Sequence, residues 1–369
     1  KRESCPGMKD DITDLHRLLL AGTPLLDVRA PVEFHKGAFP GATNIPLLDD
    51  DERHEIGICY SRHGQEAAIE LGHKLVSGDI KAERLARWQH WCEQHPDGVI
   101  YCFRGGLRSR TVQQWLAEAG IQRPLVRGGY KAMRRFLLDA LQKQLSRHPL
   151  LILAGRTGTG KTRVIEKLEN AVDLEGLAHH RGSAFGRRPG GQPAQIDFEN
   201  RLALAMLRLA GTSGPIVMED ESRLIGRCYL PVPLQEAMKQ APRVMIDEPL
   251  EARVDVTLND YVVAPLAEFE HFYGADSAFD ELAGSLLDSI DRIRKRLGGE
   301  RHRVLRAQLK EALAQQRRDG STDAHRHWIA VLLRDYYDPM YDYMMSKRDG
   351  EIRFAGRRDD VARWLLVNS

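Results

Sequence analysis

The feature that most restricts the fold is an eight-residue loop, Gly155-Arg156-Thr157-Gly158-Thr159-Gly160-Lys161-Thr162, which satisfies the pattern G-x4-G-K-[ST] in full. An apolar run over 149–154 precedes it, and a helical pattern over 163–170 follows. In this context glycines let backbone N–H groups approach a phosphate, lysine supplies a charge, and threonine can ligate Mg²⁺. The sequence therefore predicts a strand, a phosphate-binding loop and a helix. The predicted phosphate-binding residues are Gly155, Gly158, Thr159, Gly160, Lys161 and Thr162.

Two further apolar runs, 215–218 and 243–246, predict strands of the same sheet, and acidic residues follow each of them. An acid at the end of such a strand often supports the metal ion beside a bound phosphate. We predict Asp220 in this role, ahead of Asp247 and Glu248, with acids that merely end a strand as the alternative. No nucleobase-reading motif lies between the runs, so any diphosphate would suit the loop as well as ATP.

A stretch rich in glycine and arginine, 173–189, lies between these runs and contains the pair His179-His180. Adjacent histidines on a regular element diverge and no third ligand is evident, which disfavours a metal site. We expect a loop near the phosphates that contacts RNA or diphosphate, in preference to a solvated turn. The arginines concerned are Arg181, Arg187 and Arg188.

The first third of the chain also alternates strands with helices. Apolar runs at 24–29, 44–46, 98–101 and 124–126 predict strands, and helical spacing covers 65–76, 82–92 and 110–119. Such alternation predicts a mainly parallel sheet covered on both faces. A connecting helix over 133–147 follows, and arginine-rich helical patterns dominate from about Phe269. The predicted domains are 11–141, 146–268, and a basic, mainly helical region, 269–369, packed on the second domain.

The predicted strand 98–101 leads into Cys102-Phe103-Arg104-Gly105-Gly106-Leu107-Arg108. A cysteine at the carboxyl end of a parallel strand lies where ligands bind, and a following glycine pair can aim N–H groups at a thiolate or an oxyanion. Cys-x5-Arg suits both cysteine-dependent phosphatases and sulfurtransferases. We predict Cys102 as the catalytic nucleophile and Arg104, Gly105, Gly106 and Arg108 as its anion-binding loop.

The other cysteines lack such surroundings. Cys59, Cys92 and Cys228 are interpreted as structural, and Cys5 lies in the N-terminal tail. The five cysteines form no Cys-x-x-Cys pair, which disfavours a disulfide framework and a zinc site. No apolar run approaches the length of a membrane span, and the first residues lack the apolar core of a signal peptide. We therefore expect a cytoplasmic protein with no membrane partner.

Positive charge is concentrated in one part of the chain. The formal net charge is only +2, but residues 291–318 carry ten Lys or Arg and three acids. A charge run is usually a solvated face, yet this sign bias over two helix lengths indicates a polyanionic partner such as RNA. Tyrosines 336, 337, 341 and 343 could stack on bases, although core packing is the preferred interpretation.

Three functions fit these residues. The first is an enzyme that moves sulfur or selenium from Cys102 to a substrate, with the phosphate loop serving a second step. The second is a cysteine phosphatase fused to a phosphate-loop kinase. The third is a non-catalytic, nucleotide-gated RNA-binding module. The residues alone leave all three open.

A family resemblance separates them. Leu25 to Arg29, Glu33-Phe34 and Gly37 to Pro46, with the Cys102 loop and Gly128-Gly129-Tyr130, resemble the rhodanese domain over roughly the first 140 residues. Within that pattern we interpret Asp27 and Arg29 as a fold-stabilising polar pair and Glu33 as a helix cap. Adding 155–162, 173–186, 219–223 and 336–341, the chain resembles bacterial tRNA 2-selenouridine synthases over nearly its whole length.

The resemblance implies a transferase that converts wobble 2-thiouridine to 2-selenouridine in tRNAs for lysine, glutamate and glutamine. The thiouridine sulfur is first alkylated by geranyl diphosphate, and selenium from selenophosphate then replaces the geranylthio group. Cys102 corresponds to the cysteine that carries selenium, and Arg104 and Arg108 would bind selenophosphate. The phosphate loop would hold the diphosphate, with Mg²⁺ as a candidate ion.

The same resemblance implies a monomer without a tightly bound cofactor and a selenophosphate-supplying enzyme as a partner. An ATP-dependent tRNA sulfurtransferase that uses a Cys102 persulfide is the alternative function. The position of the geranyl tail has no signature in the sequence.

Overall fold

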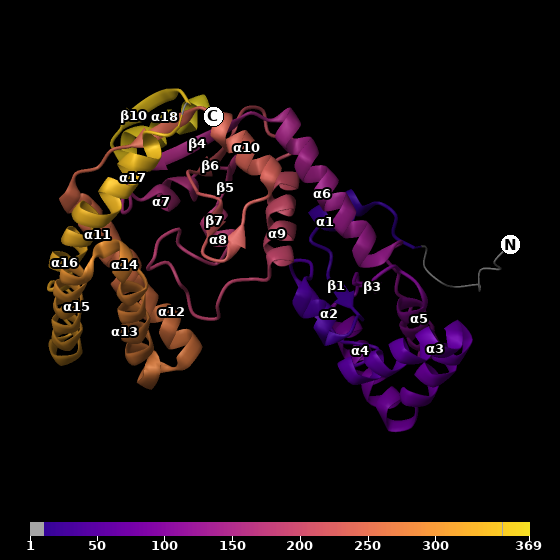
Figure 1. Ribbon diagram of the computed structural model, residues 1–369. Helices are drawn as coiled ribbons and strands as arrows, with labels where there is room; N and C mark the ends of the chain where they lie inside the picture. Colours follow the sequence, from indigo (N-terminus) through magenta and orange to yellow (C-terminus); the bar gives the residue numbers. More distant parts are fainter. Residues whose placement is uncertain (1–10, 349) are drawn as a thin grey trace. The chain divides into compact units, whose positions relative to one another are not determined.

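The computed structural model describes residues 11–348 and 350–369, and the chain divides into two compact units (Figure 1). The first unit extends to Gln142 and includes Glu199–Arg208; the second comprises Lys143–Phe198 and Leu209–Ser369. The stretch Glu199–Arg208 groups with the first unit although it lies within the predicted range 146–268. Its Asn200 explains this, because the side-chain amide donates to Ala38 O at 2.7 Å and accepts from Arg134 at 2.8 Å.

The first unit is built on a parallel sheet in the order β2-β1-β3. The strands are β1 (Leu25–Asp27), β2 (Ala42–Asn44) and β3 (Val99–Tyr101). Leu26 pairs with Thr43 on one side and with Ile100 on the other. The predicted strand at 124–126 forms only two isolated parallel bridges, Leu125 to Ile100 and Val126 to Ile12. The expected parallel α/β sheet is confirmed.

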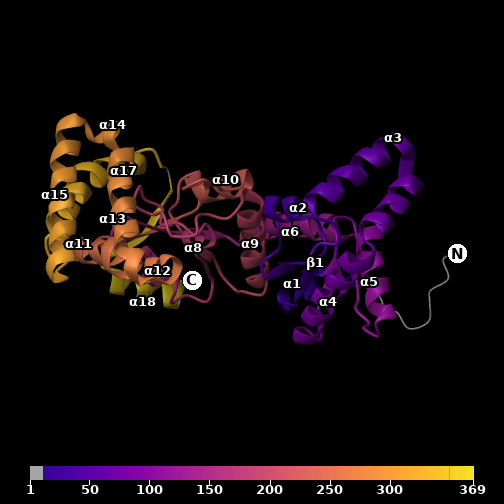
Figure 2. The ribbon, with the colours of Figure 1, turned by 90° about the horizontal axis from the view of Figure 1, so that it is seen from below.

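Helices surround this sheet. They are α1 (Leu15–Leu20), α2 (Pro31–Lys36), α3 (Asp50–Leu75), α4 (Gly78–Gln94), α5 (Leu107–Glu118) and α6 (Gly129–Arg147). The core packs Trp88 and Trp115 against the apolar strand residues. Helix α3 changes direction at Gly64, whose φ of +84° lies in the left-handed region that glycine adopts without a steric cost (Figure 2).

The predicted polar pair lies fully inside the first unit. The Arg29 guanidinium donates to both carboxylate oxygens of Asp27 and to Gly37 O, and lies 4.0 Å from the centroid of the Tyr130 ring. Both side chains are buried, so each charge depends on the other for compensation. The interpretation of Asp27 and Arg29 as a fold-stabilising pair is confirmed.

A glycine turn at the start of α6 supports the loop that follows β3. Tyr130 N donates to Cys102 O at 2.8 Å, and Gly129 has a φ of +58°. A Cβ atom at Gly129 would lie 2.2 Å from Cys102 O and 2.5 Å from Gly105 N. Only glycine therefore permits this close approach of the two backbones.

The second unit contains a five-stranded parallel sheet in the order β10-β9-β4-β6-β5. The strands are β4 (Leu150–Gly155), β5 (Ala171–Val172), β6 (Ile216–Glu219), β9 (Arg243–Ile246) and β10 (Ile352–Gly356). Connecting elements are α7 (Lys161–Ile165), α8 (Leu174–Leu177), α10 (Val232–Gln240) and the hairpin of β7 (Leu224–Ile225) and β8 (Cys228–Tyr229). Helix α9 (Gln195–Arg208) also lies between these strands in sequence, but its residues from Glu199 onward belong to the first unit. Helix α7 ends earlier than the predicted residue 170, because the chain must turn back to enter the sheet as β5.

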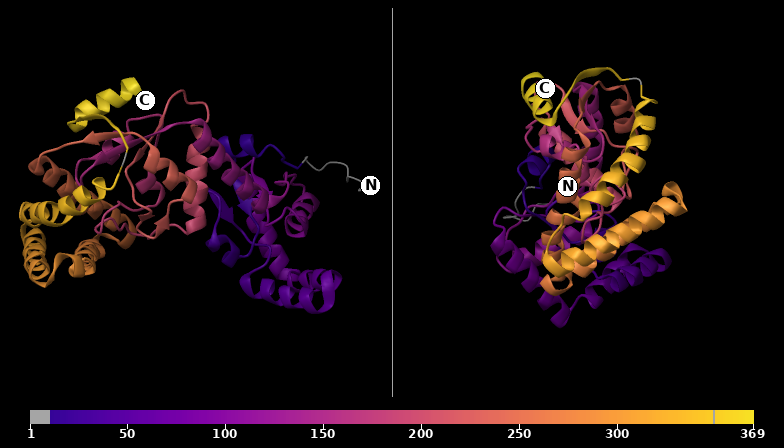
Figure 3. Two further views of the ribbon diagram at one scale, coloured as in Figure 1. Left: turned by 45° about the horizontal axis from the view of Figure 1, so that its top comes forward. Right: turned by 90° about the vertical axis from the view of Figure 1, so that its left-hand side faces the viewer.

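Two strands of this sheet, β5 and β10, lie outside the three predicted apolar runs. After the helical region the chain returns as β10, pairs with β9, and continues into α18 (Arg358–Asn368) (Figure 3). Val361 and Leu365 of α18 are fully buried in the same core as Leu151 and Leu153 of β4. The last residues of the chain therefore complete the α/β domain.

Helices between β9 and β10 form a second apolar core. They are α11 (Leu250–Leu258), η1 (Asn259–Val263), α12 (Ala264–Tyr273), α13 (Ala275–Arg292), α14 (Arg294–Leu297), α15 (Gly299–Asp319), α16 (His325–Leu332), η2 (Leu333–Tyr337) and α17 (Asp338–Met345). Tyr336 and Tyr337 belong to this core, as predicted for these tyrosines, whereas Tyr343 is exposed. The predicted helical C-terminal region is confirmed. Among the described helices, none has the length and apolarity that crossing a membrane requires.

The buried His325 predicts how the stability of the helical core depends on pH. Its Nδ1 accepts from Trp328 Nε1 at 2.9 Å, and its Nε2 lies 3.0 Å from Gln316 Oε1. Burial lowers the pKa of His325 from 6.5 to about 4. Between these two pH values His325 is protonated in the unfolded chain but neutral in the folded chain. Stability that is present above pH 6.5 is therefore lost as the pH falls toward 4.

We expect His325→Gln to weaken this dependence. Relative to the variant, the wild type should lose up to about 3 kcal/mol of unfolding free energy as the pH falls through that window. Urea denaturation followed at several pH values measures the difference. His180 also contributes to the pH dependence of stability, so the comparison uses the slopes of unfolding free energy against pH for the wild type and the variant. Parallel slopes would contradict a neutral, buried His325.

The glycine turn gives a second stability prediction. Gly129→Ala should destabilise the first unit by roughly 2 kcal/mol or more, because a positive φ and a backbone clash act together. Gly120→Ala is the matched control: its φ is +84°, but nothing lies within 4 Å of the added Cβ. That variant should lose only about 1 to 2 kcal/mol. Equal losses in chemical denaturation would show that the turn does not crowd the Cys102 loop.

Candidate functional site

Cys102 lies directly after β3, at the carboxyl end of the first sheet. Its side chain is buried, and its Sγ is 3.2 Å from Ser109 Oγ, which also contacts Gly106 O at 3.1 Å. The loop 103–106 then leads into the first turn of α5. A thiol with a hydroxyl neighbour at the start of a helix is placed for nucleophilic chemistry, since the helix start favours an anion.

The two predicted anion-binding arginines of this loop differ in their contacts. Arg104 is exposed, and its guanidinium lies 5.9 Å from the Phe103 ring centroid. Arg108 donates to both carboxylate oxygens of Glu33, at 2.5 and 3.2 Å. Arg108 could bind a substrate anion only by sharing its guanidinium with this carboxylate.

Glu33 has two functions in the loop's surroundings. Its Oε2 accepts from Ala30 N at 3.3 Å, which agrees with the predicted helix cap. Although burial alone raises the pKa of Glu33, the hydrogen bonds and charge of Arg108, with the charge of Arg53, lower it below its ordinary value. The carboxylate is therefore charged at neutral pH and holds Arg108 beside the loop.

The phosphate loop joins β4 to α7 as the motif predicts. Gly158 and Gly160 have φ values of +83° and +81°. A Cβ atom added at Gly158 would lie 2.5 Å from Thr257 Oγ1. Lys161 Nζ donates to Gly155 O at 2.9 Å, and Thr159 Oγ1 donates to Arg156 O at the same distance. The Lys161 ammonium group thus contacts a carbonyl of its own loop and is available to a phosphate bound there.

Two glutamates lie beside the loop, and sequence reasoning missed Glu175 entirely. Thr162 Oγ1 lies 3.5 Å from Glu175 Oε2, and Gly182 N donates to Glu175 Oε1 at 2.6 Å. Burial, together with the charge of Glu175, raises the pKa of Glu221 well above its ordinary value, and the two carboxyl groups share a hydrogen bond. The signal available for Glu175 was its position in a short helix directly after β5.

Asp220, the predicted metal-supporting residue, follows β6 and lines a cavity beside the phosphate loop. Its carboxylate is nearly inaccessible and forms an ion pair with Arg348. Across residues 11–348 and 350–369, no group of three or more His, Cys, Asp or Glu is arranged to hold a metal ion by itself. A metal here would need ligands from a bound phosphate.

The arginine-rich stretch forms a tight loop between the bridge partners His180 and Arg187. Ala184 anchors it: its N donates to Tyr337 Oη at 3.2 Å and its O accepts from Arg292 at 2.9 Å. Phe185 stacks on Tyr261 with ring centroids 5.4 Å apart. Burial and the charge of Arg187 lower the pKa of His180 to about 4, so this histidine is neutral.

The three arginines predicted to contact RNA or diphosphate all line the cavity, with different partners. Arg181 pairs with Asp260 at 3.3 Å, and Arg188 forms a two-point ion pair with Glu268 at 2.6 and 2.9 Å. Arg187 is exposed and has no ion-pair partner among the described residues. Only Arg187 of the three therefore offers an uncompensated charge.

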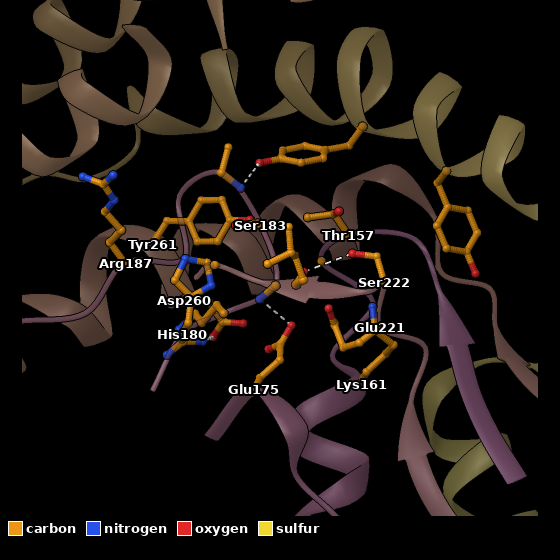
Figure 4. A pocket seen from close by; sticks show the side chains of 18 of the residues that line it. Thr157, Lys161, Glu175, His180, Ser183, Arg187, Glu221, Ser222, Asp260 and Tyr261 are labelled. Carbon is orange, nitrogen blue, oxygen red and sulfur yellow. Dashed lines mark hydrogen bonds and ion pairs between the residues drawn. The ribbon is translucent and has the colours of Figure 1, made fainter. Parts of the chain in front are cut away.

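A cavity of about 920 Å³ unites these groups within the second unit (Figure 4). Lys161, Glu175 and Glu221 lie together at one side, and Tyr261 and Arg187 lie at the other. Apolar and aromatic side chains from η2 and α17 complete the lining: Tyr336, Tyr337, Met340, Tyr341 and Met344. The cavity can thus accept a molecule with an anionic end and an apolar end.

Buried Arg253 of α11 ties the polar and apolar parts of this lining together. Its Nε donates to Thr157 O at 2.9 Å, and its two terminal nitrogens contact the Asp338 carboxylate at 3.0 and 2.5 Å. Arg156 makes a second link, with a two-point contact to Asp342. Nothing in the local sequence marks Arg253 for this role.

Comparisons with known proteins agree with this arrangement. Residues 148–369 match the family model "tRNA 2-selenouridine synthase AAA domain", and residues 11–135 match the rhodanese-like domain. A tRNA 2-selenouridine synthase from Alcanivorax borkumensis is 59% identical, with 97% of this chain and 99% of the relative covered. Relatives of the same name from Marinobacter nauticus and Pseudomonas fluorescens are each 53% identical; the alignments cover 96% and 97% of this chain and 97% and 98% of the relatives.

The resemblance expected from the motifs is confirmed. A family model covers more than half of the chain, and these relatives match it over nearly their full length. The chain belongs to the tRNA 2-selenouridine synthase family.

Proposed function

We propose that this protein converts 2-thiouridine at the wobble position of tRNA to 2-selenouridine in two steps. S-geranylation by geranyl diphosphate comes first, and selenium from selenophosphate then replaces the geranylthio group through Cys102. One observation carries the proposal: a phosphate-binding loop and an apolar wall line a single cavity. A prenyl diphosphate has this combination of charge and apolar surface, whereas ATP has no comparable apolar tail.

In the first step the thiouridine sulfur attacks C1 of the prenyl chain, and the bond from C1 to the diphosphate oxygen breaks. Negative charge accumulates on the leaving diphosphate, so a positive charge and aligned N–H groups beside it lower the barrier. Lys161 and the amides of the phosphate loop supply these, once Lys161 exchanges Gly155 O for a phosphate oxygen. The prenyl tail would lie against the wall formed by Met340, Met344 and the tyrosines.

A magnesium ion would fit beside the phosphate loop. Mg²⁺ is usually held by one or two carboxylates together with substrate phosphates and water, so the lack of a three-ligand cluster is no obstacle. Thr162 and Glu175, which are already in contact, are the residues that would hold it. When bound, such an ion would neutralise charge on the diphosphate.

In the second step the P–Se bond of selenophosphate breaks, with water taking up the phosphoryl group to give phosphate. The selenide-level selenium forms a bond to C2, the bond from C2 to sulfur breaks, and geranylthiol leaves. Alkylation makes C2 more electrophilic and provides a leaving group better than the sulfide of the unmodified base. Cys102 follows β3, with Ser109 of the first turn of α5 against its sulfur, and exposed Arg104 is available to an anion. These features support Cys102 as the residue that delivers selenium and Arg104 as a selenophosphate contact.

The division of labour between the two units is testable with single variants. Cys102→Ala should accumulate S-geranylated tRNA and form at least about 100-fold less 2-selenouridine, because only the selenium step needs the thiol. Lys161→Ala should lower geranylation by about 100-fold, because a charge that stabilises the leaving group is lost. Mass spectrometry of tRNA nucleosides, after geranyl diphosphate and selenophosphate are added separately and together, measures both.

Cys59→Ala and the exposed Lys167→Ala serve as controls with the same chemical change outside these sites. Both should modify tRNA at the wild-type rate. Full geranylation by Lys161→Ala would remove the phosphate loop from the first step. Plain 2-thiouridine in the Cys102→Ala product, or a Cys102 persulfide in place of selenium transfer, would favour a sulfurtransferase.

The apolar wall yields a further prediction. Met344→Gln places an amide in the cavity lining, whereas Met345→Gln makes the same change on the adjacent residue, which does not line the cavity. We expect the KM for geranyl diphosphate to rise about 10-fold in Met344→Gln, corresponding to about 1.4 kcal/mol of lost apolar contact. Met345→Gln should change it by less than about twofold. An equal effect of both variants would place the prenyl tail elsewhere.

A further inference from the structure

Three arginines at the cavity lining share an uncompensated charge. They are Arg187 in the loop, Arg292 at the end of α13, and Arg296 in α14. All three residues are exposed. They come from segments about 100 residues apart in sequence, and the fold brings both segments to one cavity.

The contacts of these arginines contrast with those of their neighbours. Three other arginines in the lining are matched by acids: Arg181 by Asp260, Arg188 by Glu268, and Arg348 by Asp220. Arg227, in the β7–β8 hairpin, also lines the cavity and has no ion pair among the described residues. For Arg187, Arg292 and Arg296 the described part of the chain offers no ion pair. We term these three residues the arginine triad.

The surroundings of Arg292 show that positive charges in the triad repel one another. Its guanidinium donates only to neutral atoms, Ala184 O at 2.9 Å and Ser289 Oγ at 2.6 Å. Burial and the nearby positive charge of Arg187 together lower its pKa, even though Asp288 acts in the opposite direction. An arrangement of like charges at a cavity wall gains free energy when an anion binds between them.

We propose that the arginine triad binds a backbone phosphate of the RNA substrate, at a subsite separate from the phosphate loop. Phosphate groups are the anions that arginine forks bind best. Figure 4 shows Arg187 on the opposite side of the cavity from Lys161, so the two sites can be occupied together. The exposure of the triad allows a polymer to reach it, and the arginine-rich helix α15 follows directly in the chain.

The subsite would place a nucleotide between the arginine triad and the phosphate loop. With its phosphate held by the triad, the base can enter the cavity toward the prenyl diphosphate, whose charged end lies at Lys161. This inference rests on the proposed tRNA substrate and requires no particular prenyl donor. A free oxyanion such as selenophosphate shares the same chemistry, so the experiment must separate the two sources.

The test compares two double variants of equal charge change. Arg187→Gln/Arg296→Gln removes two members of the triad, while Arg294→Gln/Lys295→Gln removes two exposed cations next to it that do not line the cavity. Arg292 is left in place because it also supports Ala184. Binding of 2-thiouridine-containing tRNA is measured by titration over a series of salt concentrations, with thermal unfolding as the check on folding.

We expect the triad variant to bind tRNA at least about 10-fold more weakly. Its plot of log K against log salt concentration should be shallower by about 1, as loss of one phosphate contact predicts. The control variant should lose less than about threefold, and both variants should bind geranyl diphosphate like the wild type.

Three outcomes would overturn the proposal. Equal losses in the two variants would indicate general charge attraction. Unchanged tRNA binding with a raised KM for selenophosphate would assign the triad to that free oxyanion. Weaker geranyl diphosphate binding in the triad variant alone would assign it to the diphosphate. Failure of the wild type to use geranyl diphosphate would refute the proposed first step and leave the tRNA comparison valid.

Discussion

A single buried guanidinium, that of Arg253, holds the second unit's cavity together. It connects the carbonyl of Thr157 in the phosphate loop with the carboxylate of Asp338 at the start of α17. Removing one partner of such a pair leaves a charge without compensation in a region of low dielectric constant, which costs several kcal/mol, about 3 to 5. The predicted phosphate-binding loop and the helix that carries the apolar wall are therefore held together by this one side chain.

That link explains the unusual path of the chain. After β9 the chain leaves the sheet, builds the helical core, forms the cavity wall with η2 and α17, and only then returns as β10. Because β10 pairs in parallel with β9, and α18 packs on the same core as β4, the wall is attached to the sheet on both sides of its sequence. A wall fixed in this way can hold a flexible apolar tail without itself becoming ordered on binding, which lowers the entropic cost.

The sequence predicted what depends on local pattern. The strand, phosphate loop and first turn of α7 follow from glycine and lysine spacing, and Cys102 follows β3 as expected. What it could not predict depends on contacts between distant segments. Arg253 contacts Asp338 across 85 positions. Arg187 lies near Arg292, which donates to Ala184 O in the same loop as Arg187. The short, largely exposed β10 has too little apolar pattern to be distinguished from a loop.

The site residues show the same division. The position of Asp220 after a strand predicts metal support, but in the structure its carboxylate pairs with Arg348, and Glu175 contacts Thr162. Burial and the charge of Glu175 raise the pKa of Glu221 well above its ordinary value, so this carboxyl pair carries less negative charge than two ordinary glutamates would. With the triad uncompensated and this carboxyl pair partly neutralised, the cavity as a whole favours anions. The proposed reaction would bring an RNA phosphate and a diphosphate into one cavity, and separate cations for the two anions would offset their mutual repulsion.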